Sequence, residues 1–271
     1  MSLLSLLFLL QSDEDPRDYW SRYTGSYEFG IGGDAAYWVP RFDGHFRVDT
    51  DSAAGTDIDL LRDLDLDRRR AIPIYGGGSF YLPITVSRTI RNEVLLTAEY
   101  WSQEWRGSSV LGAPVSLGDQ TFPSGAAVRS RFRLDSLDLA IRGRFDDHTS
   151  LFRGGISLLL HGTMGRLEMS SATAEKEGTV GEIIWGFGIY GEVRPSPYAF
   201  AGISLKGYTS FGSAWDTNMA DLQAYAGGEW GPLRLEAGFR YMPYSGDIPD
   251  DGGLRFNLYG PYAALSLVLK F

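Results

Sequence analysis

The chain has 271 residues, with 34 acidic against 25 basic side chains, a net charge of −9 and no cysteine. The absence of cysteine excludes a disulfide framework, a thiolate metal site and a lipid attached to cysteine. The acidic balance excludes the basic surface of a nucleic-acid-binding protein, and no run of residues approaches the roughly 20 apolar residues of a membrane-spanning helix.

The longest apolar run, LLSLLFLL, falls within the first twelve residues and is followed by the acidic stretch QSDEDP. Its length matches the hydrophobic part of a signal peptide, although a basic start and a small-residue cleavage site are missing. We therefore predict a leader segment over 1–12 and a lead-in over 13–25. The alternative is an amphipathic or core segment of a protein that stays inside the cell.

From residue 26 onward the sequence alternates between apolar and polar residues. In 136–145, for example, Leu137, Leu139 and Ile141 alternate with Asp138 and Arg142. Side chains alternate across a strand, so each such segment predicts a strand with one apolar face. Ten segments show this pattern, each about as long as a tilted membrane-spanning strand of roughly 9–11 residues. They are 26–39, 79–87, 93–105, 136–145, 151–164, 182–193, 198–211, 222–230, 232–241 and 262–271.

The connections between these segments alternate in length. The short ones are 87–92, 146–149, 194–197 and 230–232, and the long ones are 40–71, 106–127, 166–180, 212–220 and 243–254. This alternation is typical of barrels that cross a membrane with strands. We predict an all-β fold: a single antiparallel up-and-down transmembrane β-barrel over 26–271, with about ten strands (8 to 12). The short turns and both termini should share one end, while 40–49 either extends the first strand or forms another.

Most charged side chains of the strands fall on the face opposite the apolar one. Unpaired charges would be costly in a dry core, whereas a wet barrel interior can pair them. We predict a charge network in the lumen made of Glu28, Asp34, Glu99, Arg142, Arg144, Arg153, His161, Glu192, Lys206, Glu229, Arg234, Glu236 and Arg240.

The first long loop is rich in aspartate between residues 49 and 67. Asp57, Asp59 and Asp63 could hold a divalent cation through oxygen ligands. The simpler interpretation is a short capped helix, because Ile58, Leu61 and Leu64 lie at helical spacing. No other cofactor is expected.

The last ten residues, YAALSLVLKF, place Leu265, Leu267, Leu269 and Phe271 on one face. This ending resembles the C-terminal signal by which bacterial outer-membrane barrels are recognised for assembly. A second pattern, GTDIDL and DLDLD followed by GDQTFPSG, is similar to a group of such barrels over roughly residues 35–165 and carries no catalytic residue over. The resemblance implies a bacterial outer-membrane location with both termini in the periplasm. The implied partners are outer-membrane lipid and lipopolysaccharide, the barrel-assembly machinery and other envelope subunits, with no nucleic acid.

The expected function is a structural, adhesive or assembly-scaffold role with a largely plugged, charged lumen. About eight strands leave an interior just filled by side chains, and open channels need about 16. The alternatives are a hydrolase acting on lipid or peptide at the outer rim and a narrow solute channel. His161 and Ser157 share a strand face about 13 Å apart, too far to hydrogen-bond, so no catalytic residue is assigned and enzyme activity is not expected.

Overall fold

The computed structural model describes residues 29–49, 55–66, 68–69, 74–84, 91–146, 152–196, 198–210, 216–248 and 252–271. The expected leader over 1–12, the lead-in over 13–25 and Glu28 lie outside this part of the chain. No helix among the described residues is long and apolar enough to cross a membrane.

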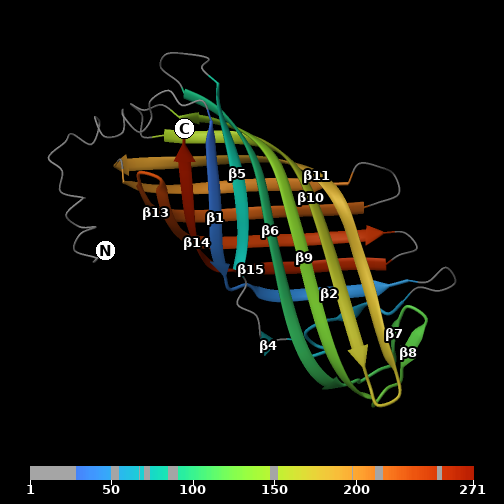
Figure 1. Cartoon of the computed structure of the whole chain (residues 1–271). Helices are drawn as coiled ribbons and strands as arrows, with labels where there is room; N and C mark the ends of the chain where they lie inside the picture. The colour runs from blue at the N-terminus through green and yellow to red at the C-terminus, as the bar shows by residue number, and fades with distance from the viewer. Residues whose placement is uncertain are drawn as a thin grey trace, which may run out of the picture.

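Within the described residues, ten antiparallel strands close into a ring (Figure 1). Each strand pairs with its neighbours in this ring, and β15 closes the ring by pairing with β1 from Gly30 opposite Lys270 to Trp38 opposite Tyr262. The predicted single antiparallel barrel of about ten strands is therefore confirmed. In order, the strands are β1 (Gly30–Trp38), β5 (Ile74–Ile84), β6 (Arg91–Val110), β9 (Ala127–Asp146), β10 (Phe152–Ser170), β11 (Glu175–Ser196), β12 (Ala199–Thr209), β13 (Asp216–Trp230), β14 (Leu233–Ile248) and β15 (Gly252–Lys270).

The stretch 40–49 extends the first strand. Strand β2 (Arg41–Val48) continues β1 along β15 without a change of register. The break between β1 and β2 falls where Val39 N–H donates to the Pro261 carbonyl at 3.1 Å. Gly260 lies opposite this break, and a Cβ there would lie 2.1 Å from the Val39 carbonyl oxygen, so only glycine fits.

The strand ends that flank the four predicted short turns share one end of the barrel, called here the turn end, with the end of β15; residues 85–90, 147–151 and 197 lie outside the described part of the chain. The turns fall between β5 and β6, β9 and β10, β11 and β12, and β13 and β14. The opposite, loop end differs from the prediction. The loops predicted over 166–180 and 243–254 are wrong, because β10 pairs with β11 up to Ser170 opposite Glu175, and β14 pairs with β15 up to Ile248 opposite Gly252.

The outer face carries a continuous belt of large apolar side chains that are exposed on the protein surface. Ile156 and Ile183 are 65% and 63% exposed, for example. A soluble protein rarely exposes so large a contiguous apolar surface, whereas lipid covers such a band on a transmembrane barrel. Other members of the belt are Ile31, Leu96, Leu137, Leu139, Ile141, Leu158, Phe187, Ile189, Ile203, Leu205, Leu235, Phe239, Leu265, Leu267 and Leu269.

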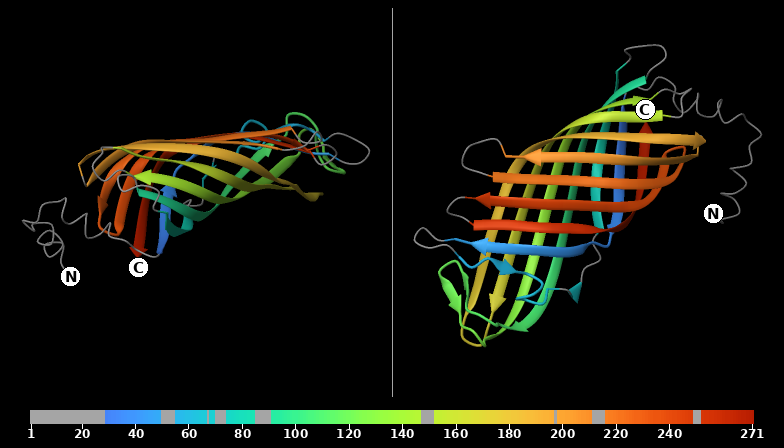
Figure 2. Two further views of the ribbon diagram at one scale, coloured as in Figure 1. Left: turned by 90° about the horizontal axis from the view of Figure 1, so that it is seen from above. Right: turned by 180° about the vertical axis from the view of Figure 1, so that it is seen from behind.

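The interior is divided into two compartments along the barrel. Towards the turn end it is lined by charged residues, and towards the loop end by a buried apolar core that includes Phe42, Trp105, Phe132 and Leu254. The long strands β6, β9, β10 and β11 have 20, 20, 19 and 22 residues and extend beyond their neighbours. They run obliquely across β13–β15 (Figure 2), and β11 contacts both β15 and β2 across the interior. The loop end is therefore flattened into a sandwich around the apolar core.

Two loop segments cover this core and form what we call the cap: residues 55–66 and the hairpin of β7 (Val115–Leu117) and β8 (Gln120–Phe122). Thr56 N–H donates to the Ser116 carbonyl at 3.1 Å, and Ser116 N–H donates to the Thr56 hydroxyl at 2.9 Å, which joins the two segments. Four aliphatic side chains of 55–66 point inward and are fully buried: Ile58, Leu60, Leu64 and Leu66.

The predicted short helix in residues 55–66 is replaced by a capped turn. Asp59 accepts hydrogen bonds from the N–H groups of Leu61 and Arg62, at 3.1 and 2.9 Å, as a helix N-cap residue would. The turn ends at Asp65, whose φ of 52° is left-handed. Flanking this turn, β3 (Ile58–Asp59) pairs with β2, and β4 (Arg68–Arg69) pairs with β6.

Candidate functional site

The charged compartment near the turn end is the candidate site, and we call it the polar chamber. It encloses a cavity of about 270 Å³. The cavity reaches from Gly231, Pro232 and Lys270 at the turn end to Glu99 and Lys206 in the middle of the barrel. Ten of the residues proposed for the lumen from the sequence line it: Asp34, Glu99, Arg142, Arg144, Arg153, Glu192, Lys206, Glu229, Arg234 and Glu236.

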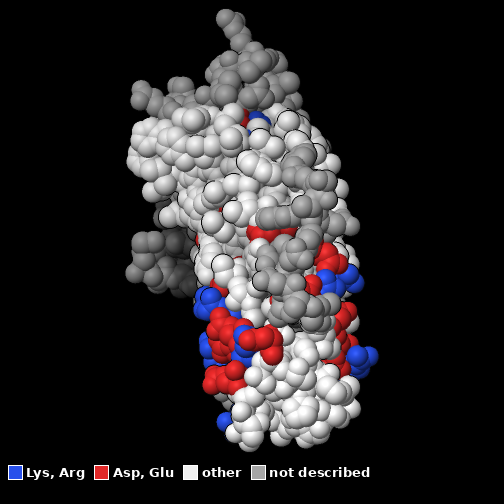
Figure 3. Space-filling model, turned by 90° about the vertical axis from the view of Figure 1, so that its right-hand side faces the viewer, with Lys and Arg blue, Asp and Glu red and all other residues white. Residues whose placement is uncertain are grey.

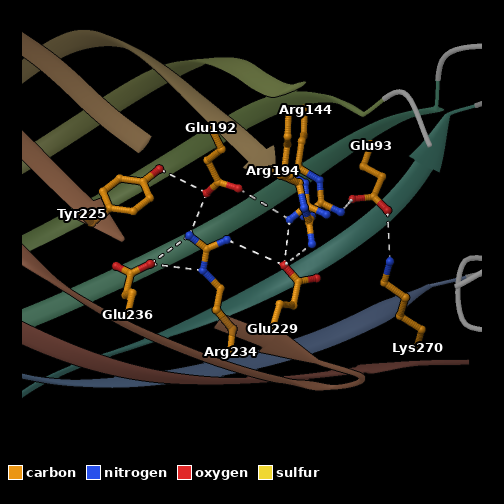
Figure 4. Close-up of polar contacts among 10 residues, drawn as sticks. Glu93, Arg144, Glu192, Arg194, Tyr225, Glu229, Arg234, Glu236 and Lys270 are labelled. Carbon is orange, nitrogen blue, oxygen red and sulfur yellow. Dashed lines mark hydrogen bonds and ion pairs between the residues drawn. The ribbon is translucent and has the colours of Figure 1, made fainter. Parts of the chain in front are cut away.

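Near the turn end, a cluster of ion pairs crosses the chamber from wall to wall (Figure 4). Glu229 on β13 contacts Arg153 of β10 at 3.1 Å and Arg194 of β11 at 3.2 Å. Arg234 on β14 contacts Glu192 of β11 at 2.7 Å. These pairs connect strands that are not neighbours in the sheet, so they bridge the bore rather than follow its wall.

The same cluster is extended by further partners. Arg234 also binds Glu236 at 2.8 Å, and its guanidinium lies 3.8 Å from the centre of the Phe200 ring. On the other side of the chamber, Glu93 forms ion pairs with Arg144 and, at 3.3 Å, with Lys270. Fixed pairs of this kind hold long side chains across the space that a solute would use.

In the middle of the barrel a second set of charges forms what we call the ion-paired layer: Glu99, Asp138, Lys206, Asp221 and Arg240. Arg240 donates two hydrogen bonds of 2.9 Å to the two oxygens of Asp221, and both side chains are fully buried. Arg240 also contacts Glu99 at 3.1 Å, and the Lys206 ammonium lies 3.2 Å from Asp221. The bidentate geometry makes the Arg240 pair the most rigid element of the layer.

His161 lies against this layer and contacts it through Asp138. Its Nδ1 lies 3.0 Å from an oxygen of Asp138, and the Tyr208 hydroxyl donates to the same oxygen at 2.9 Å. The Lys206 ammonium is 3.8 Å from the other oxygen of Asp138. His161 and Arg240 are thus placed at the boundary between the polar chamber and the apolar core.

Beyond the layer, aromatic rings fill the bore. Trp38 packs edge-on against Trp101 with ring centres 5.9 Å apart, and Arg240 lies 5.0 Å from the centre of the Trp38 ring. Further towards the loop end, Phe42 stacks on Trp105 with ring centres 4.4 Å apart. A polar solute would meet close-packed aromatic rings at this level.

Five charged residues of the site were missing from the network proposed from the sequence: Glu93, Asp138, Arg194, Asp221 and Lys270. Glu93 and Lys270 share the inward parity of Glu99 and Ser266, so the alternation could have identified both. Arg194 falls in a segment predicted as a turn, and Asp221 falls between a predicted loop and the next predicted strand. The structure extends both strands to include them.

The aspartates considered for a metal site are used differently. Asp59 caps the turn, Asp63 accepts a hydrogen bond from the Asp59 N–H at 3.0 Å, and Asp57 lies 3.6 Å from His45. No group of three acidic or histidine side chains in the described part of the chain is arranged to hold a metal ion.

Outside the barrel, strands β6, β9, β10 and β11 carry a charged face directly beyond the apolar belt. On β9 the outward positions change from Leu137 to Asp135, Arg133, Arg131 and Arg129. Arg131 binds Glu104 at 2.6 Å on the neighbouring strand β6. Figure 3 shows the blue and red side chains gathered in one zone next to a white band. The change from apolar to charged marks the edge of the belt near the loop end.

A closed antiparallel sheet, a lipid-type apolar belt and a charged interior together define the class of the protein. The chain is an outer-membrane β-barrel of the bacterial type. A comparison with protein-family models finds no match, and a comparison with curated protein sequences finds none either.

Solved structures with a similar fold are themselves bacterial outer-membrane barrels. The attachment invasion locus protein Ail of Yersinia pestis aligns over 88% of this chain and 99% of its own, with 11% identity and a TM-score of 0.32. The transport unit of the autotransporter AIDA-I from Escherichia coli aligns over 96% and 99%, with 8% identity and a TM-score of 0.40. The translocator domain of NalP from Neisseria meningitidis aligns over 90% and 89%, with 9% identity and a TM-score of 0.33. With TM-scores this low, the class rests on the sheet, the belt and the interior.

Proposed function

We propose that the protein is a closed, non-conducting barrel with a structural and scaffold role, which presents its loop end at the cell surface. The observation that carries this proposal is the double closure of the bore. The ion-paired layer around Arg240 and Asp221 blocks its middle, and the apolar core around Phe42 and Trp105 fills the half beyond. A channel would need a continuous wet path between the two ends.

The orientation follows from the connections. Barrels of this class place their short turns in the periplasm, so the turn end with Phe271 faces the periplasm and the cap faces outward. The polar chamber is then a blind pocket on the periplasmic side. The extended strands β6, β9, β10 and β11 stand out from the membrane with their charged face available for contact with lipopolysaccharide, an external surface or another envelope subunit.

Assembly is the role proposed for the closing strand. Leu265, Leu267, Leu269 and Phe271 are all outward-facing and exposed, at 45–58%. Phe271 also stacks on Phe29 with ring centres 5.1 Å apart, next to the backbone pair between the same two residues. The barrel-assembly machinery is the proposed partner of this edge before it pairs with β1.

Conductance tests the proposal. The purified full-length barrel, folded in detergent and inserted into planar lipid bilayers, should give no steady current above the bare membrane. An open outer-membrane porin in the same bilayers provides the positive control for insertion and detection. Steady large currents from the folded protein would contradict the closed bore and support the narrow-channel alternative.

A further inference from the structure

A hollow crosses the outer face of the barrel near the loop end, and we call it the outer groove. Six strands contribute three consecutive residues each to a space of about 840 Å³. The contributions are 185–187 of β11, 207–209 of β12, 218–220 of β13, 243–245 of β14, 255–257 of β15 and 43–45 of β2. This volume lies within the range of about 300–1,000 Å³ of small-ligand sites.

The strand register arranges the outward side chains of the groove in two rows. One row runs from Trp185 through Thr209, Asn218 and Ser245 to Arg255, each opposite the next on the neighbouring strand. The other row contains Phe187, Gly207, Ala220, Pro243 and Asn257. Small residues in the middle of both rows form the floor, and the rings of Trp185 and Phe187 form a wall.

The groove borders the apolar belt. On β11 it lies within the belt, between the outward Ile183 on its loop-end side and the outward Ile189 on its turn-end side, and on β12 the outward Leu205 lies on the turn-end side of Gly207. On the other side of the groove, Arg255 pairs with Asp247 at 2.8 Å. Amide and hydroxyl groups facing hydrocarbon would lose their hydrogen bonds at a high cost. The polar part of the groove on β12–β15 is therefore at the level of the lipid headgroups, and its β11 end lies on the apolar belt.

The chemistry of the lining fits a sugar. Exposed aromatic rings, here Trp185 at 46% and Phe187 at 68%, offer flat apolar faces to the C–H groups of a sugar ring. Thr209, Ser245 and Asn257 offer hydroxyl and amide groups that can both donate and accept hydrogen bonds, as sugar hydroxyls do. The one arginine of the groove, Arg255, is already engaged with Asp247, so charge attraction to a free anion is not its main feature.

We infer that the outer groove binds the sugar headgroup of an outer-leaflet glycolipid, lipopolysaccharide, with the acyl chains lying on the adjacent belt at Ile189 and Leu205. The continuity of the groove with the belt selects a lipid-anchored sugar over a soluble one, because both parts of the molecule then have a surface to contact. This inference rests on the proposed outward orientation of the loop end.

The test compares two changes at the groove with one matched change elsewhere. Trp185→Ala removes one of the two rings of the aromatic wall, and Ala220→Trp fills the floor beside Gly207. Trp230→Ala is the control, because Trp230 is also outward-facing, 38% exposed, and lies at the turn end. All three variants are first checked for the same heat-modifiable folded band as the unmodified barrel, so that loss of folding is separated from loss of binding.

Binding of purified lipopolysaccharide to the detergent-folded barrel is then measured by microscale thermophoresis. We expect Trp185→Ala to weaken binding about three- to tenfold and Ala220→Trp to weaken it at least as much, while Trp230→Ala leaves it unchanged. Equal loss in the Trp230 variant, or no loss in either groove variant, would overturn the inference. Equally tight binding of the delipidated oligosaccharide would also overturn it, since the acyl chains would then contribute nothing.

The experiments can refute the proposed groove and the proposed closed bore independently of each other. A barrel that conducts but loses lipopolysaccharide binding on Trp185→Ala would refute the proposed function and leave the groove. A silent barrel whose groove variants bind like the unmodified protein would refute the groove alone.

Discussion

The distinction between lipid and lumen can be tested on two adjacent residues of the closing strand. Leu265 faces outward, is 48% exposed and pairs with Leu235 and Ala35. Leu265 lies six residues before Phe271, which is about 20 Å along the strand at about 3.3 Å per residue. On a strand tilted about 40°, this corresponds to about 15 Å along the barrel axis, near the middle of an apolar band about 25 Å tall. Leu265→Arg should therefore destabilise the folded barrel by about 2–4 kcal/mol, the cost of an arginine facing lipid at the midplane.

Ser266 supplies the matched control, because it is the next residue and faces the other way. It lines the polar chamber and pairs in register with Asp34 and Arg234. An arginine at Ser266 would enter a wet cavity beside a carboxylate, so Ser266→Arg should cost markedly less than Leu265→Arg. The measurement is urea-induced unfolding in phospholipid vesicles, followed by tryptophan fluorescence. Equal destabilisation by the two changes would refute the reasoning, because alternation would then not separate lipid from lumen.

Three further outcomes follow from the structure. Asp221→Ala, which leaves Arg240 and Lys206 buried with one carboxylate fewer, should lower the free energy of unfolding by about 3–5 kcal/mol in the same vesicle assay; a change below about 1 kcal/mol would show that the ion-paired layer is wet and loosely held. Deletion of Phe271 should reduce assembly in cells, measured as the heat-modifiable fraction in outer-membrane preparations, far more than it reduces refolding in detergent. Leu60→Asp, which puts a carboxylate into the buried side of the cap, should increase cleavage of the loop end by added protease while the strands of the belt stay protected, and unchanged cleavage would argue against the cap as a packed unit.

The outer face was predictable because its pattern is enforced at every second residue. Leu137, Leu139 and Ile141, or Leu265, Leu267 and Leu269, must all be apolar to face lipid, so the sequence reports them directly. The charged lining followed from the same alternation, since a residue that does not face lipid must face the bore. Neither inference required knowledge of the neighbouring strands.

The loop end was not predictable in the same way. Leu167 and Phe256 are buried in the apolar core, but their outward neighbours are charged or polar because no lipid covers them. Read along the chain, such segments look like polar loops, which is why strands were missed over 166–180 and 243–254. Their stability comes from packing between β11, β15 and β2, segments that lie far apart in the sequence.

Errors in the predicted strand boundaries also explain why some charged residues of the site were not predicted. Asp221 lies at a junction between a predicted loop and a predicted strand, and only the pairing with Lys206 on β12 shows that it faces the bore. Its role depends on Arg240, which approaches from the other neighbouring strand. A contact of this kind is set by register, which the sequence alone does not specify.

The pairing of β1 with β15 has a consequence for how the protein is made. Gly30 at the start of β1 lies opposite Lys270 at the end of β15, which is synthesised 240 residues later. Until then both edges of the sheet expose unpaired backbone groups that hydrocarbon cannot satisfy, and contacts this distant in sequence form slowly. Only a chain that includes β15 can therefore close the ring. A chain interrupted before β15 by a premature stop or a proteolytic cut keeps unpaired strand edges. Such a chain remains a substrate for the proteases and chaperones of the compartment through which it travels.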